Sequence, residues 1–184
     1  AGKQASALIV VRDRSTLSPY VWVWDEVVSD GRSTIEEDAD GILDMIERNG
    51  LAYEDVDGWV GDRSARGGSR LTSTKSNGQL RKAIGEALVR RRGIRAGQAK
   101  PKTQWIETPR KWQGSVSWGL RVVNSIMGSQ RMLIHPRCEH IIEACQKFQG
   151  RKDDPHKDVL DAFRYAVQYS LTHREIGKVK VRAA

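Results

Sequence analysis

The sequence predicts one mixed α/β domain, a central β-sheet with helices packed on both faces. Three observations indicate this class. The 184 residues are 39% hydrophobic, enough for one sizeable core. Segments of strand-like and helix-like apolar spacing alternate along the chain. No window contains the roughly 18 uninterrupted apolar residues of a membrane helix. We therefore expect a soluble domain over residues 1–176 with a flexible tail at 177–184.

The first third of the chain predicts a hairpin, a helix and a short strand. Residues 6–14 and 20–28 are rich in β-forming residues and are joined by a Ser18-Pro19 turn. Ser33-x-x-Glu36 is a capping box before a run of apolar residues at helical spacing, which Asn49-Gly50 ends. GWVGD (58–62) is a short apolar strand that ends in Asp62. The tryptophans on strand patterns are expected in the core; they are Trp22, Trp24 and Trp59.

The rest of the chain predicts helices separated by short strands. Asn77 can cap a second helix, and the end of this helix at Arg90, Arg91 and Arg92 is expected to be solvated. A short strand at 94–99 and a long loop should follow. The remaining expected elements are a helix at 115–127, a strand at 131–134, a helix at 138–148 and a last helix at 157–172.

Charge is segregated along the sequence. The net charge is +8, but residues 20–62 contain 13 acids and 2 bases, whereas residues 63–112 contain 14 bases and 2 acids. A solvated surface of mixed charge would not divide in this way. The basic block predicts a surface for polyanions, nucleic acid first among them; an ordinary soluble basic surface is the alternative.

Three carboxylates lie at the ends of predicted elements. Asp62 ends a strand, and sites in α/β sheets form beyond the carboxyl ends of strands. Asp158 and Asp161 are three residues apart and share one face of the last helix, at the edge of the core. Carboxylates brought together repel one another, and a hard divalent cation normally compensates them. Taken singly, Asp158 could instead complement the helix dipole and Asp62 could cap a turn.

Three motifs in the same order resemble the nuclease domain of the large terminase subunit of tailed bacteriophages, a member of the RNase H-like superfamily. They are GDRSA (61–65), RMLIHPRCEHIIEA (131–144) and HKDVLDAFRYAV (156–167), and the resemblance covers nearly the whole chain. It implies an RNase H-like fold and a metal-dependent endonuclease. Such an enzyme cuts double-stranded viral DNA during genome packaging, in the cytoplasm of the infected bacterial host. Its implied partners are an upstream ATPase domain, the portal and the small terminase subunit.

The resemblance also implies a role for each acid. Asp62 matches the second acid of the family, Asp158 the acid of its closing motif, and Asp161 an additional helix acid used by resolvases of the superfamily. These residues would hold Mg²⁺ or Mn²⁺ in a two-metal site, with Asp161 as a ligand or a supporting acid. His156 would be an outer partner or a proton-transfer group, or simply a polar residue at the start of the helix.

The family's first acid has no clear counterpart. The opening AGKQASA resembles the turn that follows the family's first strand, so we expect that strand and its acid upstream of residue 1. Asp13 and Asp25, at the ends of the two predicted hairpin strands, are less suitable substitutes.

Seven basic residues are expected to contact the phosphate backbone. They are Arg63, Arg66, Arg70, Lys100, Lys102, Arg110 and Lys111. Two other functions stay open: a junction resolvase or transposase-like nuclease, and a non-catalytic DNA-binding or docking module of the same fold.

Overall fold

The computed structural model describes residues 6–12, 20–29, 32–56, 58–61, 77–93, 104–107, 114–151 and 153–172. The described elements are β1 (Ser6–Arg12), β2 (Val21–Val28), α1 (Ile35–Arg48), a 3-10 turn (Tyr53–Asp55), β3 (Gly58–Gly61), α2 (Asn77–Arg92), β4 (Gln104–Glu107), α3 (Ser115–Gly128), β5 (Met132–Ile134), α4 (Glu139–Lys147) and α5 (Lys157–Thr172). This order confirms the mixed α/β class.

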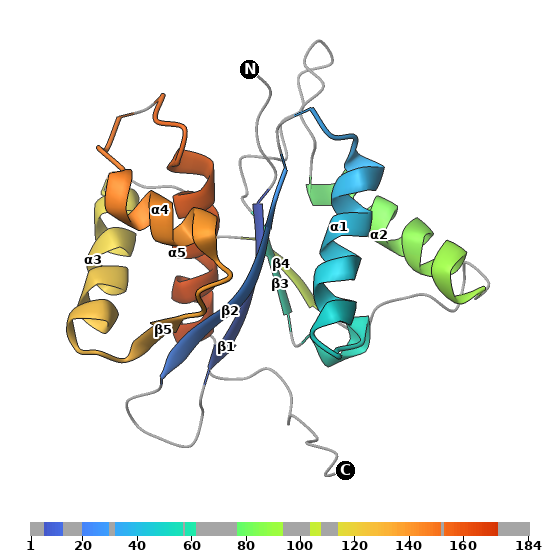
Figure 1. Cartoon of the computed structure of the whole chain (residues 1–184), viewed down its shortest axis with the longest axis horizontal. Helices are drawn as coiled ribbons and strands as arrows, with labels where there is room; N and C mark the ends of the chain where they lie inside the picture. Colours follow the sequence, from blue (N-terminus) through green and yellow to red (C-terminus); the bar gives the residue numbers. More distant parts are fainter. Residues whose placement is uncertain are drawn as a thin grey trace.

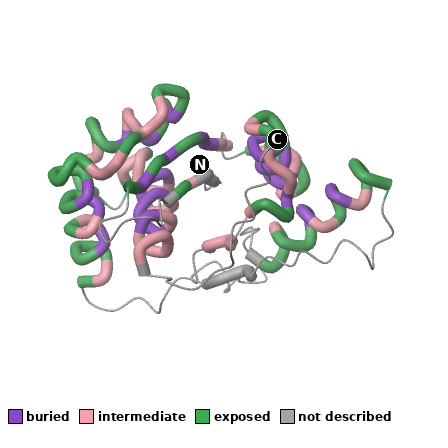
Figure 2. Tube along the Cα trace, turned by 90° about the horizontal axis from the view of Figure 1, so that it is seen from below, coloured by how far each residue is buried: buried purple, intermediate pink, exposed green. Residues whose placement is uncertain are grey.

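The strands lie between two groups of helices (Figure 1). On one side, Val21 and Val23 of β2 pack with residues of α3, α4 and α5, among them Ile141 and Phe163. On the other side, α1 and α2 pack against each other through a second apolar cluster that includes Leu43. Buried residues accordingly fall in two groups (Figure 2). Helices therefore cover both faces, as predicted.

The described strands form two sheets, whereas the sequence predicted one. β1 is antiparallel to β2, and β2 is parallel to β5. β3 and β4 form a separate parallel pair. Helix α5 contacts β1, β2 and β3, so it lies against strands of both sheets. Among the described strands, β1 has only β2 and β3 has only β4 as a neighbour.

Strand β4 lies where the sequence predicted a loop. Trp105 pairs with Trp59 and Ile106 with Val60, so β4 is defined by its partner β3. Four residues are too few to show a period, which is why the sequence pattern missed this strand. The predicted strand at 94–99 and the Ser18-Pro19 turn lie outside the described residues.

A β-bulge in the hairpin changes which side chains face which helices. Ile9 lies opposite Asp25 and the next residue, Val10, lies opposite Val23, so Trp24 is an extra residue on β2. Before the bulge, Val23 faces the α3–α5 side. After it, Asp25 contacts α1 and Glu26 contacts α4. A strict alternation would have placed Asp25 on the same face as Val23.

Strand β2 also carries two tryptophans that were wrongly expected in the core. Trp22 is 39% exposed and Trp24 is 41% exposed. The alternation of Val and Trp correctly predicted that the two residue types lie on opposite faces of β2. On the tryptophan side, α1 ends at Arg48, so no described residue covers the part of the face near Trp22 and Trp24. Trp59, by contrast, is partly buried and stacks on Tyr53 with 5.2 Å between ring centroids.

The predicted capping box of α1 is shifted by one residue. The Thr34 hydroxyl accepts from Glu37 N at 3.2 Å, and Glu37 Oε2 accepts from Thr34 N at 2.6 Å. Ser33 instead donates to Asp38 Oδ1 at 2.5 Å. Ser33–Glu36 and Thr34–Glu37 both have the spacing of a capping box. Thr34 has the extended backbone of an N-cap residue, so the box forms at Thr34 and Glu37.

Candidate functional site

The start of α5 is held by a turn built on Asp154. Its carboxylate accepts from Gln149 N and His156 N, both at 2.9 Å, and these hydrogen bonds hold the pKa of Asp154 below its usual value. Farther along, α5 is anchored to the core by apolar side chains, as predicted. The buried ones are Val159, Leu160, Phe163 and Val167. The first turn of α5 is therefore a fixed platform at the edge of the core.

Asp158 and Asp161 lie on this platform but have different surroundings. Asp158 is partly buried, and no described residue forms a hydrogen bond or an ion pair with it. Asp161 Oδ2 accepts from Lys157 Nζ at 2.7 Å, and Oδ1 accepts from Arg164 at 2.8 Å. Burial by itself would raise the pKa of Asp161, but the hydrogen bonds from these two cations hold it below its usual value. Both oxygens of Asp161 are thus engaged, whereas no side chain in the described part of the chain engages Asp158.

His156 lies beside a small hollow near the same turn. A cavity of about 160 Å³ is lined by His140, Glu143, Pro155, His156 and Val159. Neither Asp158 nor Asp161 lines it. Within the described ranges, no three His, Cys, Asp or Glu side chains are grouped so that they could hold a metal ion.

Asp62 is the residue that directly follows β3, and it lies outside the described residues. In Figure 1, β3 starts near the lower end of α1 and points toward the upper half of the molecule, where α5 begins. The seven predicted phosphate-contacting residues also lie outside the described part of the chain; they are Arg63, Arg66, Arg70, Lys100, Lys102, Arg110 and Lys111.

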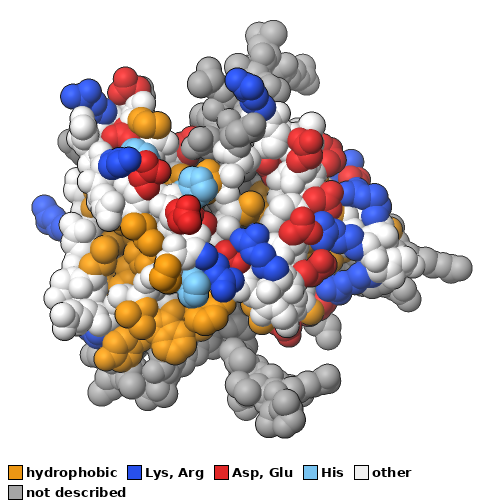
Figure 3. Space-filling model, viewed as in Figure 1, with side chains coloured by type: hydrophobic (Ala, Val, Ile, Leu, Met, Phe, Trp, Pro, Cys, Tyr) orange, Lys and Arg blue, Asp and Glu red, His pale blue; other side chains and the backbone are white. Residues whose placement is uncertain are grey.

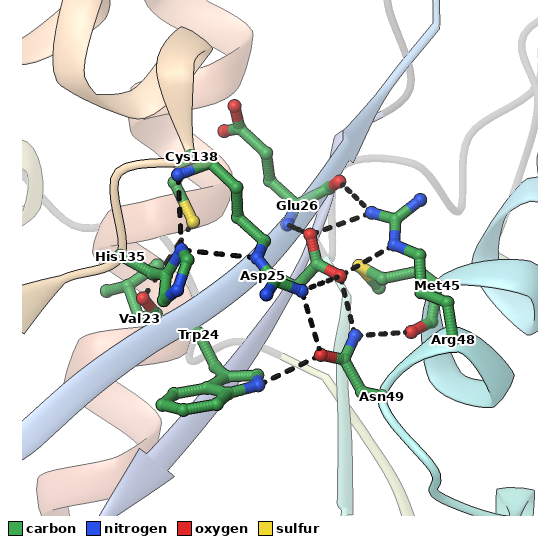
Figure 4. Close-up of polar contacts among 10 residues, drawn as sticks. Val23, Trp24, Asp25, Glu26, Met45, Arg48, Asn49, His135 and Cys138 are labelled. Atoms are coloured by element: carbon green, nitrogen blue, oxygen red, sulfur yellow. Dashed lines mark hydrogen bonds and ion pairs between the residues drawn. The ribbon is translucent and has the colours of Figure 1, made fainter.

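A buried carboxylate that the sequence did not single out as structural lies in the middle of β2. Asp25 is 1% exposed and accepts from Arg48 Nε and Nη2, both at 2.7 Å, and from Asn49 Nδ2 at 2.5 Å (Figure 4). Burial by itself would raise the pKa of Asp25, but these hydrogen bonds and one from Glu26 N lower it to about 2. Asp25 therefore binds β2 to α1 and has no oxygen available for a metal. It is also not at a strand end, because β2 continues to Val28.

The neighbouring acid binds the strand to the opposite helix. Glu26 accepts from the backbone N–H groups of His140 at 2.7 Å and Ile141 at 3.1 Å, at the N-terminus of α4. A carboxylate at this end complements the helix dipole. An Asp-Glu pair between apolar residues of one strand is the sequence signal that could have predicted these contacts. Two buried carboxylates must each have hydrogen-bond partners.

The three arginines at the end of α2 are exposed, as expected, and in addition form ion pairs with acids of neighbouring elements. Arg90 and Arg91 form ion pairs with Asp40, and Arg91 also pairs with Asp44 and Glu47. Arg92 pairs with Glu54 at 2.7 Å. Part of the segregated charge is therefore neutralised between α1 and α2.

No described helix is long and apolar enough to cross a bilayer. In comparisons with known proteins, no family model, curated protein or solved structure matches the chain.

Proposed function

We propose that this domain is a metal-dependent endonuclease that hydrolyses double-stranded viral DNA during genome packaging, as its resemblance to terminase nuclease domains implies. One observation carries the proposal. Asp158, in the closing motif, is a partly buried carboxylate without a protein partner among the described residues, on a helix that is fixed by the core. A hard divalent cation with oxygen ligands is a suitable partner for a carboxylate in this position.

The arrangement of elements supports the finer assignment to the RNase H-like fold. Helix α5 lies against β1 and β3, which are edge strands of two different sheets in the described chain. A further strand between those edges would join both sheets into one, with helices on both faces. The resemblance implies such a strand, which would carry the first acid of the family. Asp25 cannot replace this acid, because its oxygens are engaged by Arg48 and Asn49.

In this proposal the acids of the chain have distinct roles. Asp62 and Asp158 would hold Mg²⁺ or Mn²⁺, which all-oxygen ligation favours. When bound, divalent ions activate an attacking water and stabilise the leaving oxygen of a phosphodiester. Asp161, whose two oxygens accept from Lys157 and Arg164, suits a supporting role better than direct ligation. Its ion pair with Arg164 helps to hold the first turns of α5.

The partners follow from the same proposal. The seven basic residues named above, which lie outside the described part of the chain, would bind the phosphate backbone, and contacts of this kind carry no sequence information. An upstream ATPase domain, the portal and the small terminase subunit would deliver the DNA in the cytoplasm of the infected bacterium.

Cleavage of supercoiled plasmid in Mn²⁺, Mg²⁺ or EDTA tests the activity. We expect nicking only with a divalent ion, and its loss in Asp62→Asn and Asp158→Asn. Asp153→Asn, an exposed acid just before the same helix, is the matched control and should cut like the parent. Cleavage that persists in Asp158→Asn would contradict the proposal.

Metal binding gives a readout that does not depend on cleavage. Mn²⁺ should raise the melting temperature of the parent and of Asp153→Asn, and this shift should disappear in Asp158→Asn. A parent that neither cuts nor responds to Mn²⁺, but binds duplex DNA equally in EDTA, would support the non-catalytic binding module instead.

A further inference from the structure

The uncovered part of the sheet face forms an apolar surface, here called the tryptophan face, made of Val11, Trp22, Trp24 and Leu133. Val11, Trp22 and Leu133 lie side by side on β1, β2 and β5, because Trp22 is paired with both of the others. Val11 is 41% and Leu133 is 58% exposed. Figure 3 shows hydrophobic side chains gathered over β5 and the start of β2, beside a histidine and basic side chains.

Two arginines border the tryptophan face and share a single carboxylate. Arg48 takes both oxygens of Asp25, and Arg137 Nη1 lies 3.7 Å from Asp25 Oδ2. The two side chains are 48% and 43% exposed, and no other described carboxylate forms an ion pair with either of them. Among the described residues, the two guanidinium groups therefore share Asp25 as their only ion-pair partner, and this border of the face carries more positive than negative charge in its ion pairs.

The same network fixes the aromatic groups. Trp24 Nε1 donates to Asn49 Oδ1 at 2.9 Å, and Arg137 donates to the same oxygen at 3.3 Å. The ring of His135 lies against Trp24 with 5.4 Å between centroids. Figure 4 shows Trp24, Asn49, Asp25 and His135 side by side. The indole is thus held in place before any ligand arrives, which reduces the entropy cost of binding.

We propose that the tryptophan face binds single-stranded nucleic acid, with bases stacked on Trp22 and Trp24 and a phosphate on Arg48 and Arg137. Two residues along a strand correspond to about 7 Å, a spacing at which two indoles can each receive one base. Bases stack on aromatic side chains only when they are unpaired, whereas a duplex hides their faces. The two partly exposed guanidinium groups are complementary to the phosphate that links such bases.

This surface is independent of the cleavage site proposed above. None of its residues belongs to α5, and Asp25, the carboxylate that the two bordering arginines share, is buried and fully engaged. The proposal therefore goes beyond the endonuclease function and does not require it. A strand opened or displaced near the cleavage site is one ligand that this surface would suit.

Fluorescence anisotropy of a labelled (dT)20 oligonucleotide, measured in EDTA so that no cleavage occurs, tests the proposal. Trp22→Ala and Trp24→Ala should each weaken binding about tenfold, the usual effect of losing one base–aromatic stack. Trp118→Ala, at an equally exposed tryptophan of α3, should bind like the parent. The side chain of Trp22 makes no hydrogen bond with a described residue, so Trp22→Ala tests stacking even if Trp24→Ala disturbs Asn49.

Salt dependence tests the phosphate contact. Arg137→Gln should weaken (dT)20 binding and reduce the slope of log K against log salt by about 0.7, whereas Arg121→Gln on α3 should leave the slope unchanged.

Asp158→Asn should bind (dT)20 like the parent, so a failed nuclease assay and a failed binding assay can be told apart. Unchanged (dT)20 affinity in both tryptophan variants would overturn the proposal. That result is expected if the tryptophan face binds a protein instead. An equal loss for a 20-base-pair duplex would overturn the single-strand preference.

Discussion

At the scale of single residues, the chain contains acids that look alike in sequence and differ in surroundings. Asp25 is buried and accepts three hydrogen bonds from side chains. Asp161 accepts hydrogen bonds from two cationic side chains, whereas Asp158 has no partner among the described residues. Asp25 is buried and both of its oxygens accept hydrogen bonds from charged or polar side chains, so its replacement should matter for stability although Arg48 is about half exposed. Asp158 should matter for function.

Asp25 should make the stability of the parent depend on pH in a defined direction, and replacing it should remove that dependence. Its folded pKa of about 2 lies below the value of about 3.9 in an unfolded chain, so its contribution is present above about pH 4 and is lost as the pH falls toward 2. We expect Asp25→Asn to lower the free energy of unfolding by roughly 3 kcal/mol at pH 7. The difference from the parent should shrink between pH 4 and pH 2, as measured by urea denaturation.

Glu36→Gln, an exposed acid of α1, is the control and should change the free energy of unfolding by less than about 0.5 kcal/mol. A difference between Asp25→Asn and the parent that stays constant from pH 7 to pH 2 would contradict the ion-pair account.

At the scale of elements, the close approach of α3 and α5 depends on one glycine. A Cβ on Gly119 would lie 2.5 Å from Arg164 Cδ and 2.5 Å from Gln168 Nε2. Arg164 is 4% exposed, is bonded to Asp161 at 2.8 Å, and lies over the ring of Tyr165 at 4.2 Å. Because these contacts fix Arg164, it cannot easily move aside. Gly119 therefore allows α3 to lie against the helix that carries the acids.

The two helical glycines Gly119 and Gly85 should respond oppositely to alanine. Gly119→Ala should lower the free energy of unfolding by about 1–3 kcal/mol, the usual cost of overpacking. A Cβ on Gly85 of α2 would meet nothing within 4 Å, so Gly85→Ala should raise the free energy by about 0.5–1 kcal/mol through helix propensity. Urea denaturation of both variants checks this. A stabilised Gly119→Ala would show that α3 and α5 are less closely packed than described.

At the scale of the whole molecule, the segregated charges of the sequence meet across a helix pair. The acids of α1 pair with the arginines at the end of α2, and Arg91 alone contacts Asp40, Asp44 and Glu47. The first basic residues to consider for DNA binding are therefore those outside this pair. The sequence showed the charge blocks but could not show that they partly neutralise each other.

Arg91→Gln should weaken the attachment of α2 to α1. We expect the free energy of unfolding to fall by about 1 kcal/mol at low salt and by less in 1 M NaCl, because these partly exposed pairs are screened. Arg81→Gln, an exposed arginine of the same helix without a described ion-pair partner, should show neither change. An Arg91→Gln effect that is independent of salt would point to lost packing of its side chain rather than lost charge.

The sequence by itself determined the class of fold, the positions of α1 to α5 and the candidate acids of α5. These features depend on local periodicity and capping, which the chain displays within a few neighbouring residues. Only the tertiary structure decided that β4 exists as the partner of β3 and that Trp22 and Trp24 are exposed. It alone also decided that Asp161 is engaged, whereas no described residue pairs with Asp158. It also assigned Asp25 to α1, since a bulge turned that side chain toward Arg48, 23 residues away in sequence. Pairing partners of this kind are brought together by folding, and no local pattern encodes which of them will meet.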